Sequence, residues 1–223
     1  MSILAQHLQT WKQWLPPLSS FLTGGRKPGV RWTARNGARV VMRTARPADR
    51  AQIQAFVRGL SVKSRYQRFF YPVHELTPDL LERFTRADPA REVTLLAMAE
   101  GNDEDVVIGI AQYVVTDENR GEFAIVVADA WQGEGIGKSM LYALSWLARA
   151  AGIVWLDGDV LAENVAMRRL LERAGFTIRS HPEGGNLVRA TKRLSRPEGK
   201  CARLSDFLNQ VGVAPVRQSF RFA

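Results

Sequence analysis

Cysteine is nearly absent from this sequence, which holds one thiol, Cys201, among 223 residues. A single cysteine excludes an internal disulfide framework and a cysteine-ligated metal cluster, and it is compatible with a reducing cytosol. Long apolar runs are absent as well. No segment reaches the roughly 20 apolar residues that span a bilayer, and Trp11, Lys12 and Trp14 interrupt any secretory core near the N-terminus. We therefore expect a cytoplasmic protein without a membrane span.

Acidic residues are missing from the first 48 positions, where eight Lys and Arg side chains precede the first carboxylate, Asp49. Over the whole chain, 31 basic residues against 22 acidic ones give a net charge of +9. A basic arm of this kind can contact nucleic acid, anionic lipid or an acidic protein surface, and a basic surface can steer an anionic cofactor. Charge alone does not choose among these partners.

Length and composition predict one domain with an extension at each end, because 46% hydrophobic residues suffice for one core. We expect residues 1–37 to form an amphipathic helix and a basic linker, residues 38–195 to form the domain, and residues 196–223 to form a C-terminal extension. In the first segment, apolar side chains recur at i, i+4, i+7 and i+11 from Leu4, on one face of a helix. This face would pack on the body or on a second subunit, so a homodimer stays open, and an interfacial membrane helix is the alternative.

Hydrophobic periodicity predicts alternating strands and helices in residues 38–195, the pattern of an α/β fold. The predicted elements are, in order, a strand at 39–44, a helix at 48–60, a helix from 77, strands at 93–99, 106–115 and 122–127, a helix from 135, a strand at 154–161, a helix at 163–174, and strands at 176–180 and 187–194. The three strands between residues 93 and 127 are expected to be antiparallel, because short turns join them. The two helices after the first strand would form a flap.

Aromatic and basic side chains are interleaved between residues 59 and 70, a pattern that also occurs on RNA-stacking surfaces. Tyr66, Phe69 and Phe70 lie at helical spacing there, and aromatic residues in such a pattern are more often part of a core. We therefore predict that these three side chains are buried, and we do not expect nucleic acid as a partner.

The stretch from Glu122 to Ser139 joins an apolar strand, a glycine-rich turn and the start of a helix, with Gln132-x-x-Gly135-x-Gly137 at its centre. Such a turn leaves backbone N–H groups unpaired at the positive end of the helix dipole, without a Cβ in the way, and this arrangement suits a phosphate. A turn that merely bends the chain is the structural alternative. The dinucleotide pattern Gly-x-Gly-x-x-Gly is absent, and a P-loop would need a glycine at Gln132.

This turn resembles the Gln/Arg-x-x-Gly-x-Gly/Ala loop of the GNAT N-acetyltransferase superfamily. The strand at Asp157, the helix start at Asn164 and the following Gly175-Phe176 are similar to its second cofactor motif. Within the superfamily, Gly59-Leu-Ser-x-x-Ser-x-Tyr-x-Arg-Phe-Phe70 most resembles the bacterial protein lysine acetyltransferases of the Pat type. The resemblance covers roughly residues 39–194 and implies the α/β GNAT fold, a mixed central sheet with antiparallel N-terminal strands and splayed central strands, flanked by helices.

The resemblance implies direct transfer of an acetyl group from acetyl-CoA to an amine, with lysine side chains of proteins as the acceptors. Glu122 would be the catalytic base, and Asp157 and Asp159 would flank the acceptor groove and attract a cationic lysine. The implied cofactor-binding residues are Val126, Val127, Gln132, Gly133, Gly135, Gly137, Lys138, Ser139 and Asn164. Taken by itself, Asn164 is equally a helix N-cap. No metal site is expected, because neither a histidine nor a third carboxylate stands at ligand spacing from the two aspartates.

One position departs from many small-molecule GNAT enzymes: Leu171 stands where those enzymes have a tyrosine that protonates the departing thiolate, so that mechanism is unavailable at this position. Two alternatives remain open, namely acetylation of a small amine, and a non-catalytic module that binds acyl-CoA and uses its basic arm for RNA or a protein. Acyl-CoA synthetases are the protein substrates that family analogy suggests.

Overall fold

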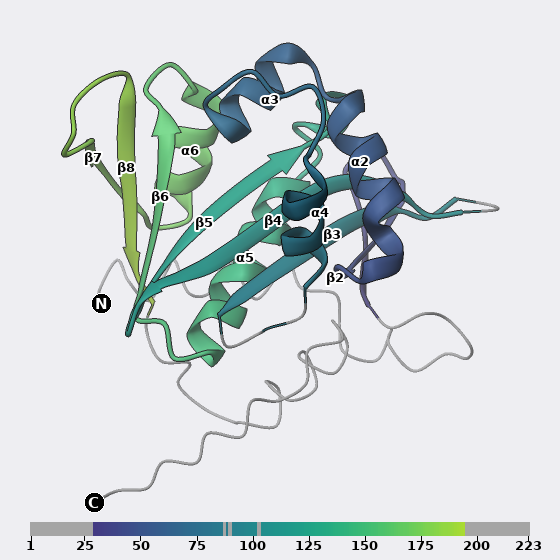
Figure 1. Cartoon of the computed structure of the whole chain (residues 1–223), viewed down its shortest axis with the longest axis horizontal. Helices are drawn as coiled ribbons and strands as arrows, with labels where there is room; N and C mark the ends of the chain where they lie inside the picture. The colour runs from purple at the N-terminus through teal and green to yellow at the C-terminus, as the bar shows by residue number, and fades with distance from the viewer. Residues whose placement is uncertain (1–28, 87, 89–90, 102–103, 195–223) are drawn as a thin grey trace, which may run out of the picture.

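The computed structural model describes residues 29–86, 88, 91–101 and 104–194 (Figure 1). The expected helix near Leu4, the C-terminal extension and Cys201 lie outside the described residues. Among the residues that are described, no helix has the length and apolar content to cross a membrane.

An eight-stranded sheet forms the centre of the molecule, with the strand order β1-β2-β3-β4-β5-β6-β8-β7. The strands are β1 Val30–Thr33, β2 Arg39–Thr44, β3 Glu92–Ala99, β4 Val106–Asp117, β5 Arg120–Val127, β6 Trp155–Leu161, β7 Thr177–Ser180 and β8 Leu187–Arg193. All neighbouring pairs are antiparallel except β5 and β6, which are parallel. The predicted mixed sheet and the antiparallel order of its N-terminal strands are confirmed.

The parallel pair β5 and β6 stays together over a short distance only. Its register joins Arg120–Glu122 to Trp155–Asp157, and beyond these pairs the two strands diverge, as Figure 1 shows. Strands that diverge leave the backbone N–H and C=O groups along their facing edges without strand partners. The expected splay therefore lies between β5 and β6, and it opens immediately after Glu122.

Helices cover both faces of the sheet, with α2 and α4 in front and α5 behind in the view of Figure 1. The helices are α2 Arg50–Gly59, α3 Val62–Phe69, α4 Pro78–Thr85, α5 Ile136–Ala150 and α6 Val165–Arg173, with 3-10 turns at Pro47–Asp49 (η2) and Asp129–Trp131 (η3). Two apolar clusters result, one between the sheet and α5 and the other under α2 and α4. Side-chain caps fix three helix starts, because the oxygens of Ser61, Thr77 and Asn164 each accept a hydrogen bond from a backbone N–H in the first turn.

Two parts of the chain differ from the sequence prediction. The segment expected to be a linker before residue 38 contains β1, which pairs with β2 and carries the buried side chain of Val30. The predicted domain start thus falls between two paired strands. A four-residue strand beside glycine and arginine gives too short an apolar pattern to be recognised, and the charge of Arg31 is compensated by Glu100 at 2.9 Å.

The flap also differs, because it contains three helices instead of two. The additional helix is α3, and the prediction that Tyr66, Phe69 and Phe70 are buried was wrong for Tyr66, which is 43% exposed. Phe69 is partly buried against the apolar cluster under α2 and α4, and Phe70, which follows the helix, is also partly buried. The reason is that α3 contacts β5 beside a cavity, which Phe69 and Phe70 line and Tyr66 does not. Phe70 ends the helix with φ at 62°, a conformation that is uncommon for an aromatic residue.

Replacing Gly158 by Ala should lower the free energy of unfolding by about 1–3 kcal/mol. A Cβ at this position of β6 would lie 2.4 Å from a ring carbon of Phe123, which is itself packed on Phe176 with ring centroids 5.1 Å apart. The matched control is Gly59→Ala at the end of α2, where an added Cβ meets nothing within 4 Å. Denaturant unfolding should show a loss for the first variant and either no change or a gain for the second. Equal stabilities of the two variants would contradict the close packing at Gly158.

Candidate active site

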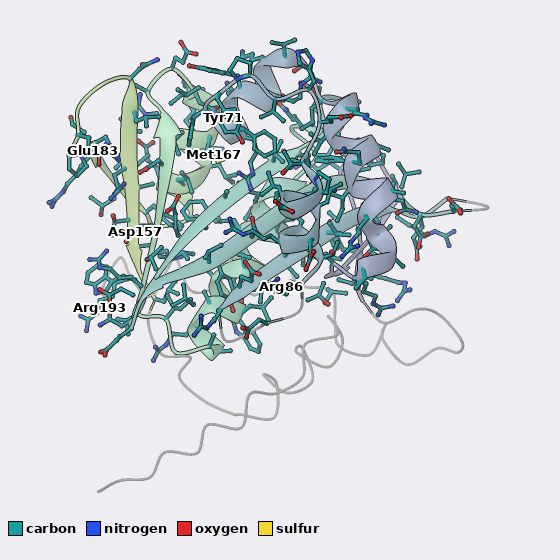
Figure 2. All side chains as sticks on the ribbon, in the orientation of Figure 1. Tyr71, Arg86, Asp157, Met167, Glu183 and Arg193 are labelled. Carbon is teal, nitrogen blue, oxygen red and sulfur yellow. The ribbon has the colours of Figure 1, made fainter. Side chains whose placement is uncertain are left out.

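A cavity of about 990 Å³ opens where β5 and β6 separate. Its walls come from α3 and α4 on one side, from β5 and the glycine-rich turn, and from the start of α6 on the other side. Tyr71 and Met167, labelled in Figure 2, both line it, the first from the segment after α3 and the second from α6. The cavity therefore brings together most of the residues that the sequence marked, although some of them are as far apart in the chain as Phe69 and Asn164.

The open edge of β5 presents backbone groups of Val127 to this cavity. Ala128 N–H donates to the Ile108 carbonyl at 2.9 Å, toward β4. Because the direction of backbone groups alternates along an antiparallel strand, those of Val127 point the opposite way, into the splay. The Gln132 side chain supports this, since its Nε2 donates to the Val127 carbonyl at 3.2 Å. The sequence paired Val126 with Val127, but the same alternation turns the backbone of Val126 toward Ile110 of β4.

The glycine-rich turn has the backbone conformation that an anion site requires. Gly133 has φ at 84° and Gly135 has φ at 88°, in the region that favours glycine, and α5 begins directly after Gly135. Backbone conformation, and not steric crowding, favours glycine at these two positions, because an added Cβ on either would meet nothing within 4 Å. At Gly137, a Cβ would come within 3.4 Å of Leu170, so the helix start lies close to α6. The amides of this first turn face a cavity wall, at the end of a helix that favours negative charge.

Three predicted residues of this turn have different surroundings. The backbone N–H of Gln132 donates to the Asp129 carbonyl at 3.3 Å, so Gln132 contributes through its side chain. The Ser139 N–H donates to the Gly135 carbonyl at 3.1 Å within the helix, and Ser139 does not line the cavity. Lys138 does line it and can add a positive charge beside the amides of the turn.

Asp129 connects the turn to helix α3. Its carboxylate accepts hydrogen bonds from Ser61 N–H at 2.9 Å, from Ser61 Oγ at 2.7 Å and from Ser64 Oγ at 2.7 Å. Burial by itself would raise the pKa of Asp129, but these hydrogen bonds outweigh it and hold the pKa below its ordinary value. Ser64 also accepts from Gln132 Nε2 at 3.2 Å. The two serines of the 59–70 motif thus fix α3 against the turn, a link that the sequence prediction missed because Asp129 precedes the Gln132-x-x-Gly135-x-Gly137 pattern and was assigned no role.

Asn164 lies at the start of α6 and lines the cavity. Its Oδ1 accepts the Met167 N–H at 3.1 Å, which is the capping role that the sequence left open. The Nδ2 group is the part of this side chain that can donate to a ligand. Capping and ligand binding are therefore compatible.

Glu122 lies on β5 at the point where the splay begins, and it lines the cavity. Its side chain is exposed and forms no hydrogen bond or ion pair with the described residues. It shares a face of the sheet with Gln112, because the register pairs Gln112 with Ala124, two residues further along β5. A carboxylate that is exposed to the cavity and unpaired is able to accept a proton.

The two aspartates of β6 are already paired. Asp157, near the closed end of the splay in Figure 2, accepts hydrogen bonds from Arg120 and, at 2.7 Å, from Thr191. Asp159 lines the cavity and binds Arg189 through two hydrogen bonds of 2.7 and 2.9 Å, which raise the pKa of Arg189 above its ordinary value. Because arginines compensate both carboxylates, their attraction for an acceptor lysine is weaker than the sequence suggested.

Arg68 of α3 is a cavity residue to which the sequence prediction assigned no role. Burial lowers its pKa to about 10, against the attraction of the Glu122 carboxylate. Its Nη2 is 3.5 Å from Gln112 Oε1, and its guanidinium lies over the Phe69 and Phe84 rings. Arg68 lies in the 59–70 motif, so its position as a basic residue between the aromatic residues Tyr66 and Phe69 was the signal that the sequence offered.

Two further observations bear on the chemistry. Leu171 is fully buried, so the position of the tyrosine acid in other GNAT enzymes belongs to the core here. Among the described residues, no group of three or more His, Cys, Asp and Glu side chains is placed to hold a metal ion.

Comparisons with known proteins agree with this geometry. Acetyltransferase PA5475 of Pseudomonas aeruginosa is 29% identical over 154 residues, which are 69% of this chain and 83% of that protein. Acetyltransferase Pat of Mycolicibacterium smegmatis is 34% identical over 117 residues, 52% of this chain, and the match spans 34% of the length of that protein.

Solved structures and family models give the same assignment. The GNAT domain of S. lividans PAT has a TM-score of 0.68 and 26% identity, covering 74% of this chain and 97% of that domain. A family model described as an acetyltransferase (GNAT) domain matches residues 39–177, more than half of the sequence. The chain therefore belongs to the GNAT acetyltransferase family.

Proposed function

We propose that this protein transfers an acetyl group from acetyl-CoA directly to a primary amine, with Glu122 as the base. The observation that carries the proposal is the common cavity, in which an unpaired carboxylate, an open strand edge and a positive-φ glycine turn face the same space. Acetyl-CoA would supply a thioester whose carbonyl carbon is open to attack by an amine.

The residues of the turn fit the phosphates of that donor. Gly133, Gly135 and Gly137 offer backbone N–H groups at the start of α5, and Lys138 adds a point charge. The splayed edge of β5 fits the extended pantetheine arm, because backbone groups there have no strand partner. We assign the Asn164 amide to the same arm.

The transfer step requires a neutral amine and an electrophilic carbonyl. A lysine amine with a pKa of about 10.4 is neutral in about one molecule in 2,500 at pH 7, a penalty near 4–5 kcal/mol that a positioned base offsets. Glu122 accepts this proton. The Val127 N–H, directed into the splay, is placed to donate to the carbonyl oxygen as negative charge develops there.

We propose lysine side chains of proteins as the acceptors. The support is the likeness to two proteins named Pat and an exposed Glu122 at the cavity wall. The chain spans about one third of the length of the M. smegmatis protein, so the activity of that whole protein is not transferred to this chain, and the acceptor named here is a proposal. Acyl-CoA synthetases as substrates belong to the same proposal and rest on family analogy. Cytoplasmic location is also part of it and rests on the low cysteine content, which suits a reducing compartment.

The test is acetyl-CoA turnover, followed by release of free thiol, against a panel of lysine-bearing proteins and small amines. The panel should include an acyl-CoA synthetase and the same protein with its lysines methylated. Turnover that depends on unmodified protein lysines supports the proposal. Turnover with small amines alone would instead favour the small-molecule reaction, and tight acetyl-CoA binding without turnover on any acceptor would favour a non-catalytic binding module.

A further inference from the structure

The guanidinium of Arg68 is poorly satisfied within the cavity. A guanidinium carries five N–H donors, and the one hydrogen bond of Arg68 to the described residues is the 3.5 Å contact from Nη2 to Gln112 Oε1. Its Nε is buried and has no partner among the described residues. The Phe69 and Phe84 rings, with centroids 4.9 and 5.7 Å from the guanidinium carbon, cover its faces but accept no in-plane hydrogen bond.

Two other arginines of the described chain show how a carboxylate satisfies the guanidinium fork, although the buried Nε atoms of Arg149 and Arg168 also have no partner. Arg43 and Arg189 each hold a carboxylate through two hydrogen bonds of 2.6–2.9 Å. A cation that is partly buried, with its Nε fully buried, and that lacks such a partner is costly, because it loses hydration and gains no ion pair in return. The planar fork of the Arg68 donors matches a carboxylate in two-point geometry. An anionic group of a ligand would therefore complete this site.

The position of Arg68 indicates which ligand brings that anion. Ser64, one turn before Arg68 on α3, contacts the side chain of Gln132 at the glycine turn, where the donor phosphates would lie. Arg68 itself contacts Gln112 and is attracted by Glu122, at the other end of the cavity. The phosphates are thus accounted for elsewhere, and the acyl and pantetheine groups of the donor carry no charge. The anion must come from the acceptor.

We propose that Arg68 binds a carboxylate of the acceptor, so that this enzyme selects amines that carry a carboxylate near the reacting nitrogen. The inference rests on the proposed function, in which Glu122 receives the proton of the amine. Glu122 and Arg68 then form a pair of opposite charges that matches a zwitterionic acceptor. Two sources share this chemistry: a free amino acid, and a protein lysine with an adjacent Asp or Glu.

The experiment compares acceptors that differ only in this charge. One arm uses ω-amino acids of increasing chain length beside their amides, and the other uses lysine peptides with Glu or Gln next to the lysine. In the wild type, we expect kcat/KM to be about 10–100-fold higher for the carboxylate member of at least one matched pair. Arg68→Gln should remove this preference, so that the ratio of kcat/KM values within each matched pair falls to about one. Arg68→Lys, which keeps the charge but loses the fork, should fall between them.

Several results would overturn the proposal. Equal kcat/KM for both members of every pair in the wild type would do so, and so would a uniform loss with Arg68→Gln, which would mean that Arg68 only positions Glu122. The thermal midpoint and the CoA affinity of each variant show whether it is folded.

If no acceptor is turned over, the proposed function fails, but titration of the CoA-saturated protein with the same pairs of acceptors still decides the role of Arg68. Tighter binding of the carboxylates, lost in Arg68→Gln, supports it, and equal binding overturns it.

Discussion

Glu122→Gln should lower kcat for acetyl transfer by a factor of about 10²–10⁴ at pH 7, with the affinity for acetyl-CoA unchanged within about twofold. The variant keeps the size of the side chain at the cavity wall but removes the group that accepts the proton of the amine. Because the Glu122 side chain forms no hydrogen bond or ion pair with the described residues, the substitution should leave the fold intact. Steady-state thiol release and equilibrium binding of acetyl-CoA measure the two quantities separately.

The pH dependence gives this variant a distinct signature. Without a base, transfer depends on amine that is already neutral, and that fraction rises about tenfold per pH unit below a pKa of about 10.4. The residual activity of Glu122→Gln should therefore recover steeply between pH 7 and 9. The control is Glu118→Gln, an exposed carboxylate in the turn between β4 and β5 that does not line the cavity. A Glu122→Gln enzyme with the rate and pH profile of the wild type would exclude Glu122 as the base.

Local patterns were sufficient to predict the central part of this fold. The apolar run before Val127 and the glycines at 133, 135 and 137 predicted a strand, a glycine-rich turn and a helix start, and the structure has these elements in this order. Such predictions succeed because a positive φ is tolerated almost only by glycine and because strand and helix periods differ. That the central strands splay was implied by family resemblance alone, and the position of the splay after Glu122 was not predicted, since no local pattern encodes where two parallel strands separate.

Contacts between segments that are distant in the chain could not be predicted from the sequence. Asp129 binds Ser61 and Ser64, which precede it by 65 residues or more, and neither periodicity nor spacing links these positions. The pairing of Asp157 and Asp159 with arginines was missed for the same reason, so both carboxylates were interpreted as free to attract a substrate. Burial on one face of α3 was also misjudged, because helical spacing shows that a stripe is apolar but not whether it meets a core or a cavity.

The ion pair between Arg43 and Asp49 holds the flap to the sheet. Arg43 of β2 donates to both oxygens of Asp49, at 2.6 and 2.7 Å, and the Arg46 N–H adds a third hydrogen bond of 2.7 Å to this carboxylate. The two side chains are 9% and 8% exposed, and Asp49 directly precedes α2. Burial alone would raise the pKa of Asp49, but the hydrogen bond from Arg43 and that from Arg46 outweigh it, so its pKa lies below the ordinary value.

Asp49→Asn should therefore lower the free energy of unfolding by about 3–5 kcal/mol at pH 7, because it leaves the Arg43 charge buried without a partner. Adding Arg43→Met should recover part of this loss, since it removes that charge. The control is Glu75→Gln in the Arg58–Glu75 pair, whose side chains are 61% and 57% exposed. A change of no more than about 1 kcal/mol is expected there.

The stability difference should also depend on pH. A carboxylate whose pKa is lowered by folding stabilises the fold at pH values above its pKa in the unfolded chain, about 3.9, and this contribution is lost as the pH falls through its lower pKa in the folded protein. In denaturant titrations, the gap between wild type and Asp49→Asn should thus be constant above about pH 5 and narrow below pH 4. A gap that widened in acid would show that the carboxylate is not stabilised by this pair.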